Sequence, residues 1–204
     1  MGTLAGKGAA RTAAAIAASE GLWRWGMGVH LLYLPCALIM NVLLYKLLKA
    51  VEPTLALLAL AFALVALAIE ASFILHLFVP LALAGDGGPF AAIGGEQRNA
   101  LSYLAIRLYS IGFGLALFFF SGFCIFVGTL MLRSGYLPKT VGALMLAAGL
   151  AYLASGFTSV VSPSLSAVVS PWLLIPCFLG EASVALWLLL TGAKGRTQAP
   201  ESAS

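Results

Sequence analysis

Residues 54–79 read TLALLALAFALVALAIEASFILHLFV, and Glu70 is the single Asp, Glu, Lys or Arg in this run. A helix needs about 20 predominantly apolar residues to cross the hydrocarbon core of a bilayer. Because the run is longer than that and lies between Pro53 and Pro80, it predicts a membrane-spanning helix. It also raises the question of what stabilises a carboxyl group in such a place.

The composition extends this prediction to the whole chain. Of the 204 residues, 62% are hydrophobic and 9% are charged, whereas soluble domains carry about 25% charged residues. No soluble core of this size could bury so much apolar surface, so the excess must contact lipid. We therefore predict an all-α polytopic transmembrane helix bundle, with the lipid bilayer as its principal partner.

Apolar runs separated by short polar segments predict the organisation of this bundle. Residues 1–24 are expected to be an N-terminal interfacial segment that leads to the cluster Trp23-Arg24-Trp25, because aromatic and basic side chains suit the headgroup layer. Residues 25–192 form the predicted transmembrane bundle, and residues 193–204 a polar C-terminal tail. The five predicted spans cover about residues 25–45, 54–79, 103–132, 140–160 and 171–191.

The basic residues predict an orientation. Cytoplasmic loops carry an excess of Lys and Arg, and one predicted side holds Lys46, Lys49, Arg133, Lys139, Lys194 and Arg196. We expect this side, and the C-terminus with it, to be cytoplasmic. The net charge of +4 comes from such positions rather than from a basic run with interleaved aromatics, so no nucleic-acid partner is predicted.

Three stretches resemble a known family: AARTAAAIAASEGLWRWGMGVHLLYLPCALIMNVLLYKLL, LRSGYLPKTVGALMLAAGLAYL and PWLLIPCFLGEASVALWLLLTG. They are similar to a bacterial family of small multi-spanning membrane proteins catalogued as a domain of unknown function, number four-three-eight-six. The most specific parts are Arg133-Ser134-Gly135-Tyr136-Leu137-Pro138 and the pair formed by Pro176 and Gly180-Glu181. The likeness covers about residues 10–192 and implies a multi-span helical fold in a bacterial plasma (inner) membrane, without an activity.

The resemblance also bears on the number of spans. Members of that family usually have another hydrophobic span ahead of the segment that matches residues 10–24, and this sequence has none there. We therefore expect either a five-span variant or a chain that starts late.

Polar residues inside the spans are the candidate site. An ionisable group at the centre of a span costs at least about 2.5–3.5 kcal/mol, so it usually has a partner or a function. The informative residues are Glu70, His76, Arg107 and Glu181, with His30 and Asn41 as lesser members. Counting about 1.5 Å per residue from the span ends places all of them except Asn41 in the outer half of the bundle.

Two interpretations of these residues remain open. In the first, Glu70, Arg107 and Glu181 line an outer polar cavity that binds a proton, a cation or a small ligand. In the second, Glu70 pairs with Arg107, while a protonated Glu181 hydrogen-bonds a neighbouring helix.

Metal, cofactor and enzyme sites are not predicted. His30 and His76 fall on different spans without an i,i+4 partner, and a metal site needs three or four converging ligands. The three cysteines lie apart in apolar runs, with no CxxC pair. No catalytic motif such as GxSxG, HExxH or a phosphate-binding loop is present, so no catalytic residue is assigned.

Glycine and proline predict how the helices pack. Gly142, Gly149 and Gly156 recur every seven residues, a stripe that lets another helix approach closely. Pro35 and Pro176 each remove one backbone hydrogen bond inside a span and favour a kink. A kink beside Glu181 is typical of transporters, but helices also bend this way when they pack in a bundle.

These observations leave three functional hypotheses. The first is a protein that binds or transports a small ligand, proton or cation through Glu70, Arg107 and Glu181. The second is a non-catalytic assembly or packing partner of another membrane protein. The third, less favoured for want of a catalytic motif, is a membrane-embedded redox or lipid enzyme that uses His30 or His76.

Overall fold

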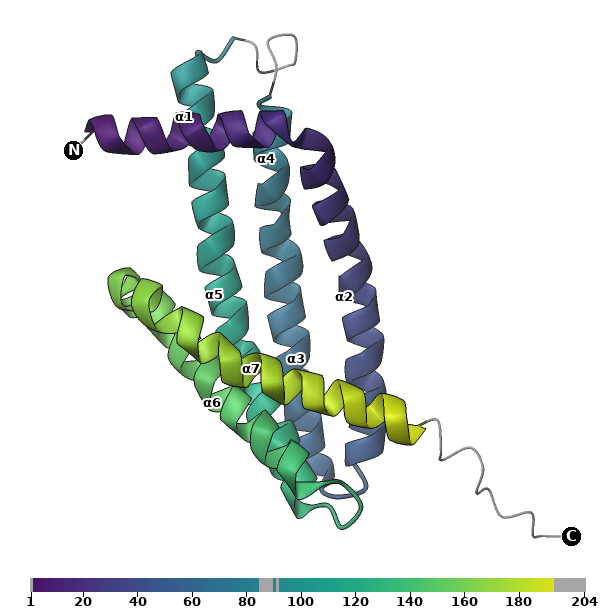
Figure 1. The fold of residues 1–204 in the computed structure, drawn as a ribbon. Coiled ribbons are helices and arrows are strands. Elements are labelled where there is room, and N and C mark those ends of the chain that lie inside the picture. The colour runs from purple at the N-terminus through teal and green to yellow at the C-terminus, as the bar shows by residue number, and fades with distance from the viewer. Residues whose placement is uncertain (1, 85–89, 91, 193–204) are drawn as a thin grey trace, which may run out of the picture. The chain divides into compact units, whose positions relative to one another are not determined.

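A computed structural model describes residues 2–84, 90 and 92–192, and all regular structure in these residues is helical. The prediction of an all-α fold is confirmed. The tail predicted for residues 193–204 lies outside the described residues. In chain order the elements are α1 (Gly2–Ala18), α2 (Glu20–Leu48), α3 (Pro53–Phe73), the 3-10 helix η1 (Ile74–Phe78), α4 (Val79–Ala82), α5 (Gly95–Arg133), α6 (Lys139–Val161) and α7 (Pro163–Gly192) (Figure 1).

The predicted number of spans is also confirmed. Within the described residues, five helical segments are long and apolar enough to cross a membrane: Glu20–Leu48, Pro53–Ala82, Gly95–Arg133, Lys139–Val161 and Pro171–Leu190. Every predicted span lies inside a longer helical segment, because intrahelical hydrogen bonds continue to satisfy the backbone beyond the apolar run. Helices α2 and α7 continue through Pro35 and Pro176.

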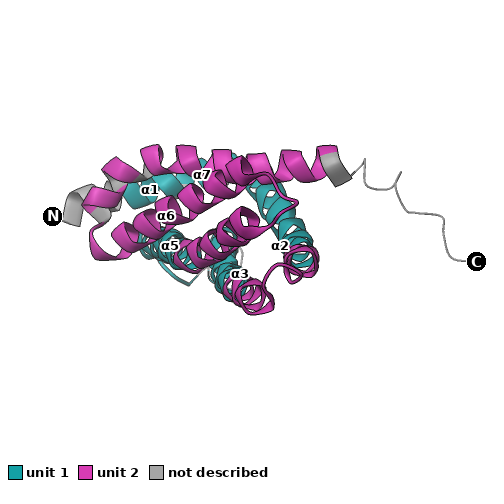
Figure 2. Ribbon diagram, turned by 90° about the horizontal axis from the view of Figure 1, so that it is seen from below, with its two compact units in different colours: residues 1–40, 65–116 teal, residues 41–64, 117–204 magenta. Residues whose placement is uncertain are grey.

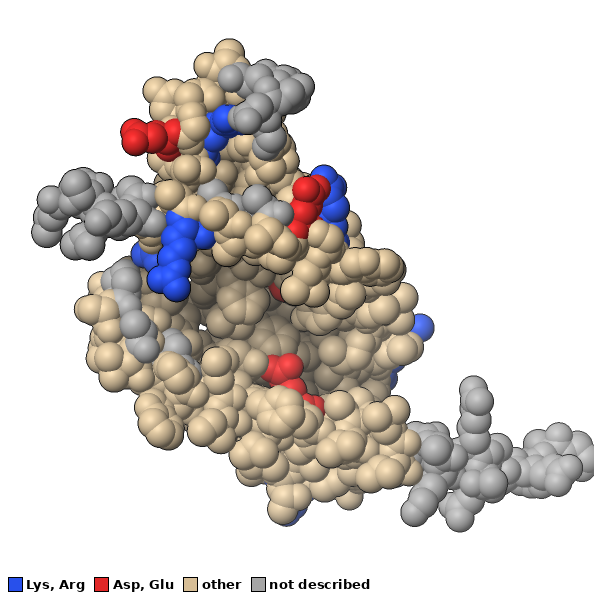
Figure 3. Space-filling view, turned by 45° about the horizontal axis from the view of Figure 1, so that its top comes forward, with Lys and Arg blue, Asp and Glu red and all other residues tan. Residues whose placement is uncertain are grey.

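The surface of these helices is apolar. Trp172, Phe178 and Leu189 of α7 are 73%, 72% and 71% exposed. Figure 3 shows how little of the face in view is formed by Lys, Arg, Asp or Glu. A surface of this kind is unfavourable in water and favourable against lipid chains.

The chain divides into two compact units, which are described separately. Unit 1 consists of Met1–Met40 and Val65–Ala116, and unit 2 of Asn41–Leu64 and Leu117–Ser204 (Figure 2). Helices α2, α3 and α5 therefore each contribute one part to unit 1 and another part to unit 2.

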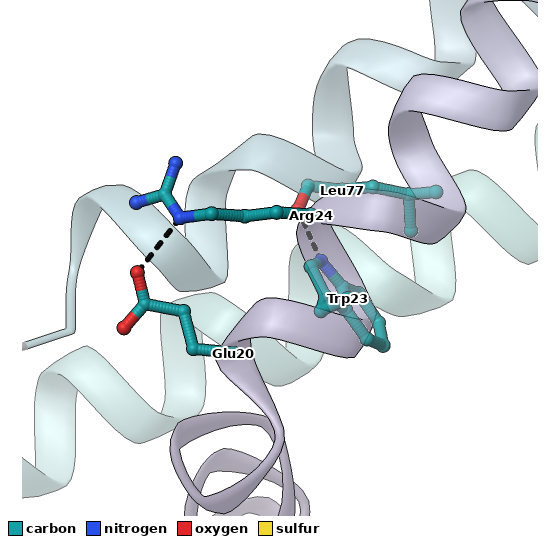
Figure 4. A network of polar contacts seen from close by, with 4 residues as sticks. All are labelled: Glu20, Trp23, Arg24 and Leu77. Atoms are coloured by element: carbon teal, nitrogen blue, oxygen red, sulfur yellow. Dashed lines mark hydrogen bonds and ion pairs between the residues drawn. The ribbon is translucent and has the colours of Figure 1, made fainter.

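In unit 1, the N-terminal helix α1 lies across the other helices rather than alongside them (Figure 1). It contacts α4 and buries Ala9 and Ile16. After the break at Ser19, the Trp23 indole nitrogen of α2 donates a hydrogen bond of 3.0 Å to the Leu77 carbonyl of η1 (Figure 4). This bond fixes the start of α2 against η1.

In unit 2, α6 packs along α7, and both α6 and α7 contribute to a core that includes residues of α5. Backbone contacts at glycines make this packing close. A Cβ atom at Gly128 of α5 would lie 2.6 Å from the Leu146 nitrogen of α6, and one at Gly149 of α6 would lie 2.8 Å from the Ile125 nitrogen of α5. Gly142 also lies against α5, and Gly156 is buried.

The connection between α5 and α6 contains the sequence Arg133-Ser134-Gly135-Tyr136-Leu137-Pro138. The Ser134 hydroxyl donates to the Met131 carbonyl and accepts from the Leu137 backbone N–H at 3.1 Å. The Tyr136 hydroxyl donates to the Leu47 carbonyl at the end of α2, at 2.9 Å. The motif therefore joins the end of α2, next to Lys46 and Lys49, to the connection between Arg133 and Lys139.

Glu52 starts α3 in the same part of unit 2. Its carboxylate accepts hydrogen bonds from the backbone N–H groups of Leu55 and Thr54, as an N-cap residue does. These bonds, that from Leu55 above all, favour the charged form and lower the pKa of the Glu52 carboxyl, with a smaller contribution from Arg133.

The glycine contacts predict that Gly128→Ala lowers the stability of unit 2. Its Cβ atom would meet backbone atoms, which cannot rotate away, so the free energy of unfolding should fall by about 1–3 kcal/mol. Gly26→Ala in α2 is the matched control, because nothing lies within 4 Å of its Cβ position. Unfolding of the purified protein in detergent, followed by circular dichroism, measures both; equal stability of the two variants would contradict the packing described.

Candidate functional site

Unit 1 contains a polar pair inside its candidate spans. The Nε2 atom of His30 on α2 lies 2.8 Å from Oε1 of Glu70 on α3, within hydrogen-bonding distance. The two side chains are only 20% and 13% exposed. The His30 ring also packs edge-on against Tyr33, with 5.8 Å between ring centroids. The carboxyl group of the opening sequence is therefore paired with an imidazole.

The alternative that Glu70 pairs with Arg107 is wrong. The structure describes both residues and forms no ion pair between them; Arg107 lies on α5 with its side chain exposed. An exposed Arg side chain can extend its charged end toward the lipid headgroups. The shorter His30 side chain instead lies between α2 and α3, where it contacts Glu70. The sequence placed His30 and Glu70 in the same half of the bundle, which is the signal that could have found this pair.

His76 has a local role in unit 1. Its Nδ1 atom lies 3.1 Å from the Phe73 carbonyl, and its ring stacks on the Phe73 ring at a centroid distance of 5.3 Å. The same Phe73 ring occupies the space that Gly112 of α5 leaves, since a Cβ atom there would lie 2.0 Å from Phe73 Cγ. His76 therefore stabilises the change from α3 to η1 rather than meeting Glu70.

Unit 2 holds a second polar pair inside candidate spans. The Tyr152 hydroxyl of α6 donates a hydrogen bond to Oε1 of Glu181 on α7. Glu181 is partly buried, Tyr152 is 9% exposed, and Phe120 of α5 packs edge-on against the Tyr152 ring at 5.4 Å. Tyr152 was not predicted from the sequence, although a phenol in the middle of an apolar span is itself a signal of a polar partner.

Close packing of α6 and α7 positions this second pair. A Cβ atom at Gly180 would lie 2.6 Å from Ala148 Cβ and 2.8 Å from the Leu144 carbonyl oxygen. One turn earlier, the Cys177 thiol lies 3.7 Å from the Ala148 carbonyl. Residues four apart lie on one face of a helix, so Tyr152 lies one turn after Ala148 on the face of α6 that contacts α7. There it meets Glu181, the residue after Gly180.

The surroundings of Glu181 contain thiols and no paired cation. Among the residues that the structure describes, Glu181 forms no ion pair. Cys124 and Cys177 are 0% and 1% exposed and lie within electrostatic range of its carboxyl group. In the same described part of the chain, no group of three or more His, Cys, Asp or Glu could hold a metal ion.

Asn41 of unit 2 is a third buried polar group. It is 3% exposed, and its Oδ1 atom has no hydrogen-bond partner among the described residues. A buried acceptor without a donor costs about 1–3 kcal/mol. The described residues around Asn41 therefore leave this acceptor uncompensated.

The pair in unit 1 predicts non-additive mutations. His30→Phe and Glu70→Leu should each lower the free energy of unfolding by about 1–3 kcal/mol, because each leaves a polar group without its partner. The double variant should be more stable than the sum of the two changes predicts, since it removes both polar groups. Unfolding in detergent measures the cycle. Strict additivity would show that the two residues do not interact.

The comparisons with known proteins concern the family alone. Neither the curated proteins nor the solved structures include a match to this chain. One family profile matches residues 3–192, a range that includes His30, Glu70, Tyr152 and Glu181. The chain belongs to the family described as Domain of unknown function (DUF4386).

Proposed function

We propose that this chain is a polytopic protein of a bacterial plasma membrane that binds a proton, or a small cation in its place, at the Glu181 carboxyl group and transports it. The observation that carries the proposal is the hydrogen bond from Tyr152 to Glu181 inside two candidate spans, with no cationic partner for Glu181 among the described residues.

Charge energetics support a neutral Glu181. An ionised acid at the centre of a span costs about 2.5–3.5 kcal/mol on insertion scales, and a counter-charge would reduce that cost. Glu181 has a phenol instead, which is neutral and can donate one hydrogen bond. One neutral donor offsets less of the cost of an ionised acid than a cation would, so in this proposal the carboxyl group carries its own proton. Exchange of that proton for one from outside, or for a small cation, is the reaction that the pair permits.

The pair in unit 1 supports the same function. His30 and Glu70 together can hold one proton as a neutral imidazole with a carboxylic acid or as an imidazolium with a carboxylate, and the net charge is the same. A proton can therefore move between the two residues without changing the net charge of the pair, which is the step that a proton relay needs. Arg107 and His76, which belong to the candidate set predicted from the sequence, have no role in this proposal.

Basic residues support the proposed orientation. Lys46 lies in the last turn of α2 and Lys49 just after it, while Arg133 ends α5 and Lys139 begins α6. The bond from Tyr136 to Leu47 joins the end of α2 to the connection between α5 and α6. An excess of Lys and Arg is typical of the cytoplasmic side. We therefore propose that this end of unit 2 and the C-terminus are cytoplasmic.

Assembly with another membrane protein is the second candidate function. The exposed aromatic residues Trp172 and Phe178 on α7 favour it, because aromatic side chains are common at interfaces. The glycine stripe does not, since Gly142 and Gly149 contact α5 of the same chain. Assembly alone also leaves the polar groups of Glu70 and Glu181 without a function.

Proton flux into vesicles tests the proposal. The purified chain is reconstituted with a pH-sensitive dye inside, and a pH gradient is imposed with the membrane potential clamped. We expect the wild type to dissipate the gradient faster than protein-free vesicles, and Glu181→Gln to be at least about tenfold slower than the wild type, a difference of about 1.4 kcal/mol in activation free energy.

Two further variants sharpen the flux measurement. Tyr152→Phe should lie between the wild type and Glu181→Gln, because it keeps the carboxyl group and removes its donor. Glu20→Gln is the matched control and should match the wild type, since Glu20 is exposed and, within the described part of the chain, its ion pair is with Arg24. A wild-type flux no greater than that of empty vesicles, or full flux in Glu181→Gln, would refute the proposal.

A further inference from the structure

A groove at the N-terminus of unit 1 lies outside both polar pairs. Its volume is about 350 Å³, and it is lined by Arg11, Thr12, Ala15, Ile16, Ser19 and Trp23. These residues come from one face of α1, from the break after it and from the start of α2. We propose that this groove binds the phosphate headgroup of an anionic phospholipid, with Arg11 as the residue that holds the phosphate.

Charge is the first argument for this occupant. Helix α1 contains Lys7 and Arg11 and no acidic residue. Arg11 is exposed and forms no ion pair with a described acid, unlike Arg24, which pairs with Glu20 at 2.8 Å. A guanidinium group matches phosphate oxygens with two parallel N–H donors. The uncompensated charge favours a headgroup with a net negative charge over a zwitterionic one.

The hydrogen bonds of the groove leave Arg11 as its donor without a partner among the residues that the structure describes. The Thr12 hydroxyl donates to the Gly8 carbonyl at 2.9 Å, and the Ser19 hydroxyl donates to the Ala15 carbonyl at 2.7 Å. The Trp23 indole N–H donates to the Leu77 carbonyl (Figure 4). The oxygens of Thr12 and Ser19 can still accept bonds from headgroup hydroxyls.

The wall of the groove suits a lipid rather than a free phosphate ester. Ala15, Ile16 and the Trp23 ring supply apolar surface beside Arg11. The bond to Leu77 fixes the plane of the Trp23 ring, so this surface is present before a ligand binds. Helix α1 lies across the other helices of unit 1 and carries Arg11, and Trp23 follows at the start of α2 (Figure 1). A crossing helix with basic and aromatic side chains beside it is typical of the membrane interface. Acyl chains would lie against the apolar side.

Lipid retention by the full chain tests the inference. The protein is purified in a mild detergent, titrated with phosphatidylglycerol or phosphatidylcholine, and the bound lipids are counted by native mass spectrometry. We expect tighter binding of phosphatidylglycerol, and an apparent dissociation constant about tenfold weaker in Arg11→Gln, as for the loss of one charge-assisted hydrogen bond. Arg24→Gln is the matched control and should bind like the wild type.

Two further measurements separate loss of the phosphate contact from misfolding and from binding of a free phosphate ester. Thermal unfolding of Arg11→Gln should match the wild type, because the Arg11 side chain is exposed. Glycerol 3-phosphate at millimolar concentration should not displace the lipid, because it lacks acyl chains. Equal binding of the two lipids, unchanged binding in Arg11→Gln, or full displacement by glycerol 3-phosphate would each overturn the inference.

Discussion

The free-energy cost of a polar group in hydrocarbon constrains every candidate span of this chain. Hydroxyls inside the spans satisfy it locally: Ser121 donates to the Phe118 carbonyl, and Thr129 donates to the Ile125 carbonyl on the same helix. A carboxyl group cannot be satisfied by its own helix in this way and needs a partner on another. Glu181 has the Tyr152 hydroxyl and Glu70 has the His30 imidazole. Neither partner has a permanent charge, unlike Arg or Lys, and the proposed proton chemistry uses this property.

Small residues make the partner of Glu181 available. Gly180 and Ala148 allow the backbones of α6 and α7 to approach each other closely. This approach places Glu181, the next residue of α7, beside Tyr152, one turn further along α6. The residue after Ala148, Gly149, contacts the backbone of α5. A larger side chain at Gly180 or Ala148 would separate α6 from α7 and leave the Glu181 carboxyl group without its donor. Packing and polar chemistry in unit 2 therefore depend on the same few positions.

Much of the fold could be predicted from the sequence, because a run of apolar residues is a local property. The five spans and the all-α class follow from run length and composition alone. The structural position of the family motif around Tyr136 could not be predicted, since the bond from its hydroxyl to Leu47 joins segments that are distant in sequence.

The contacts of the candidate residues were predicted less well, for a related reason. Depth in the membrane can be counted along a helix, so Glu70, His30 and Glu181 could be selected as polar groups inside spans. The rotation of each helix and the identity of its neighbour cannot be counted. Charge complementarity therefore suggested Arg107 for Glu70, where the fold supplies His30, and it gave no reason to select Tyr152.

The protonation state of Glu181 tests the proposed proton chemistry most directly. Infrared spectra of the reconstituted protein resolve the C=O stretch of a protonated carboxyl group. We expect such a band in the wild type, its loss in Glu181→Gln, and its shift to higher frequency in Tyr152→Phe, because removing a hydrogen-bond donor strengthens the C=O bond. A spectrum unchanged by Glu181→Gln, or a band at the same frequency in Tyr152→Phe, would contradict a protonated Glu181 that is hydrogen-bonded to Tyr152.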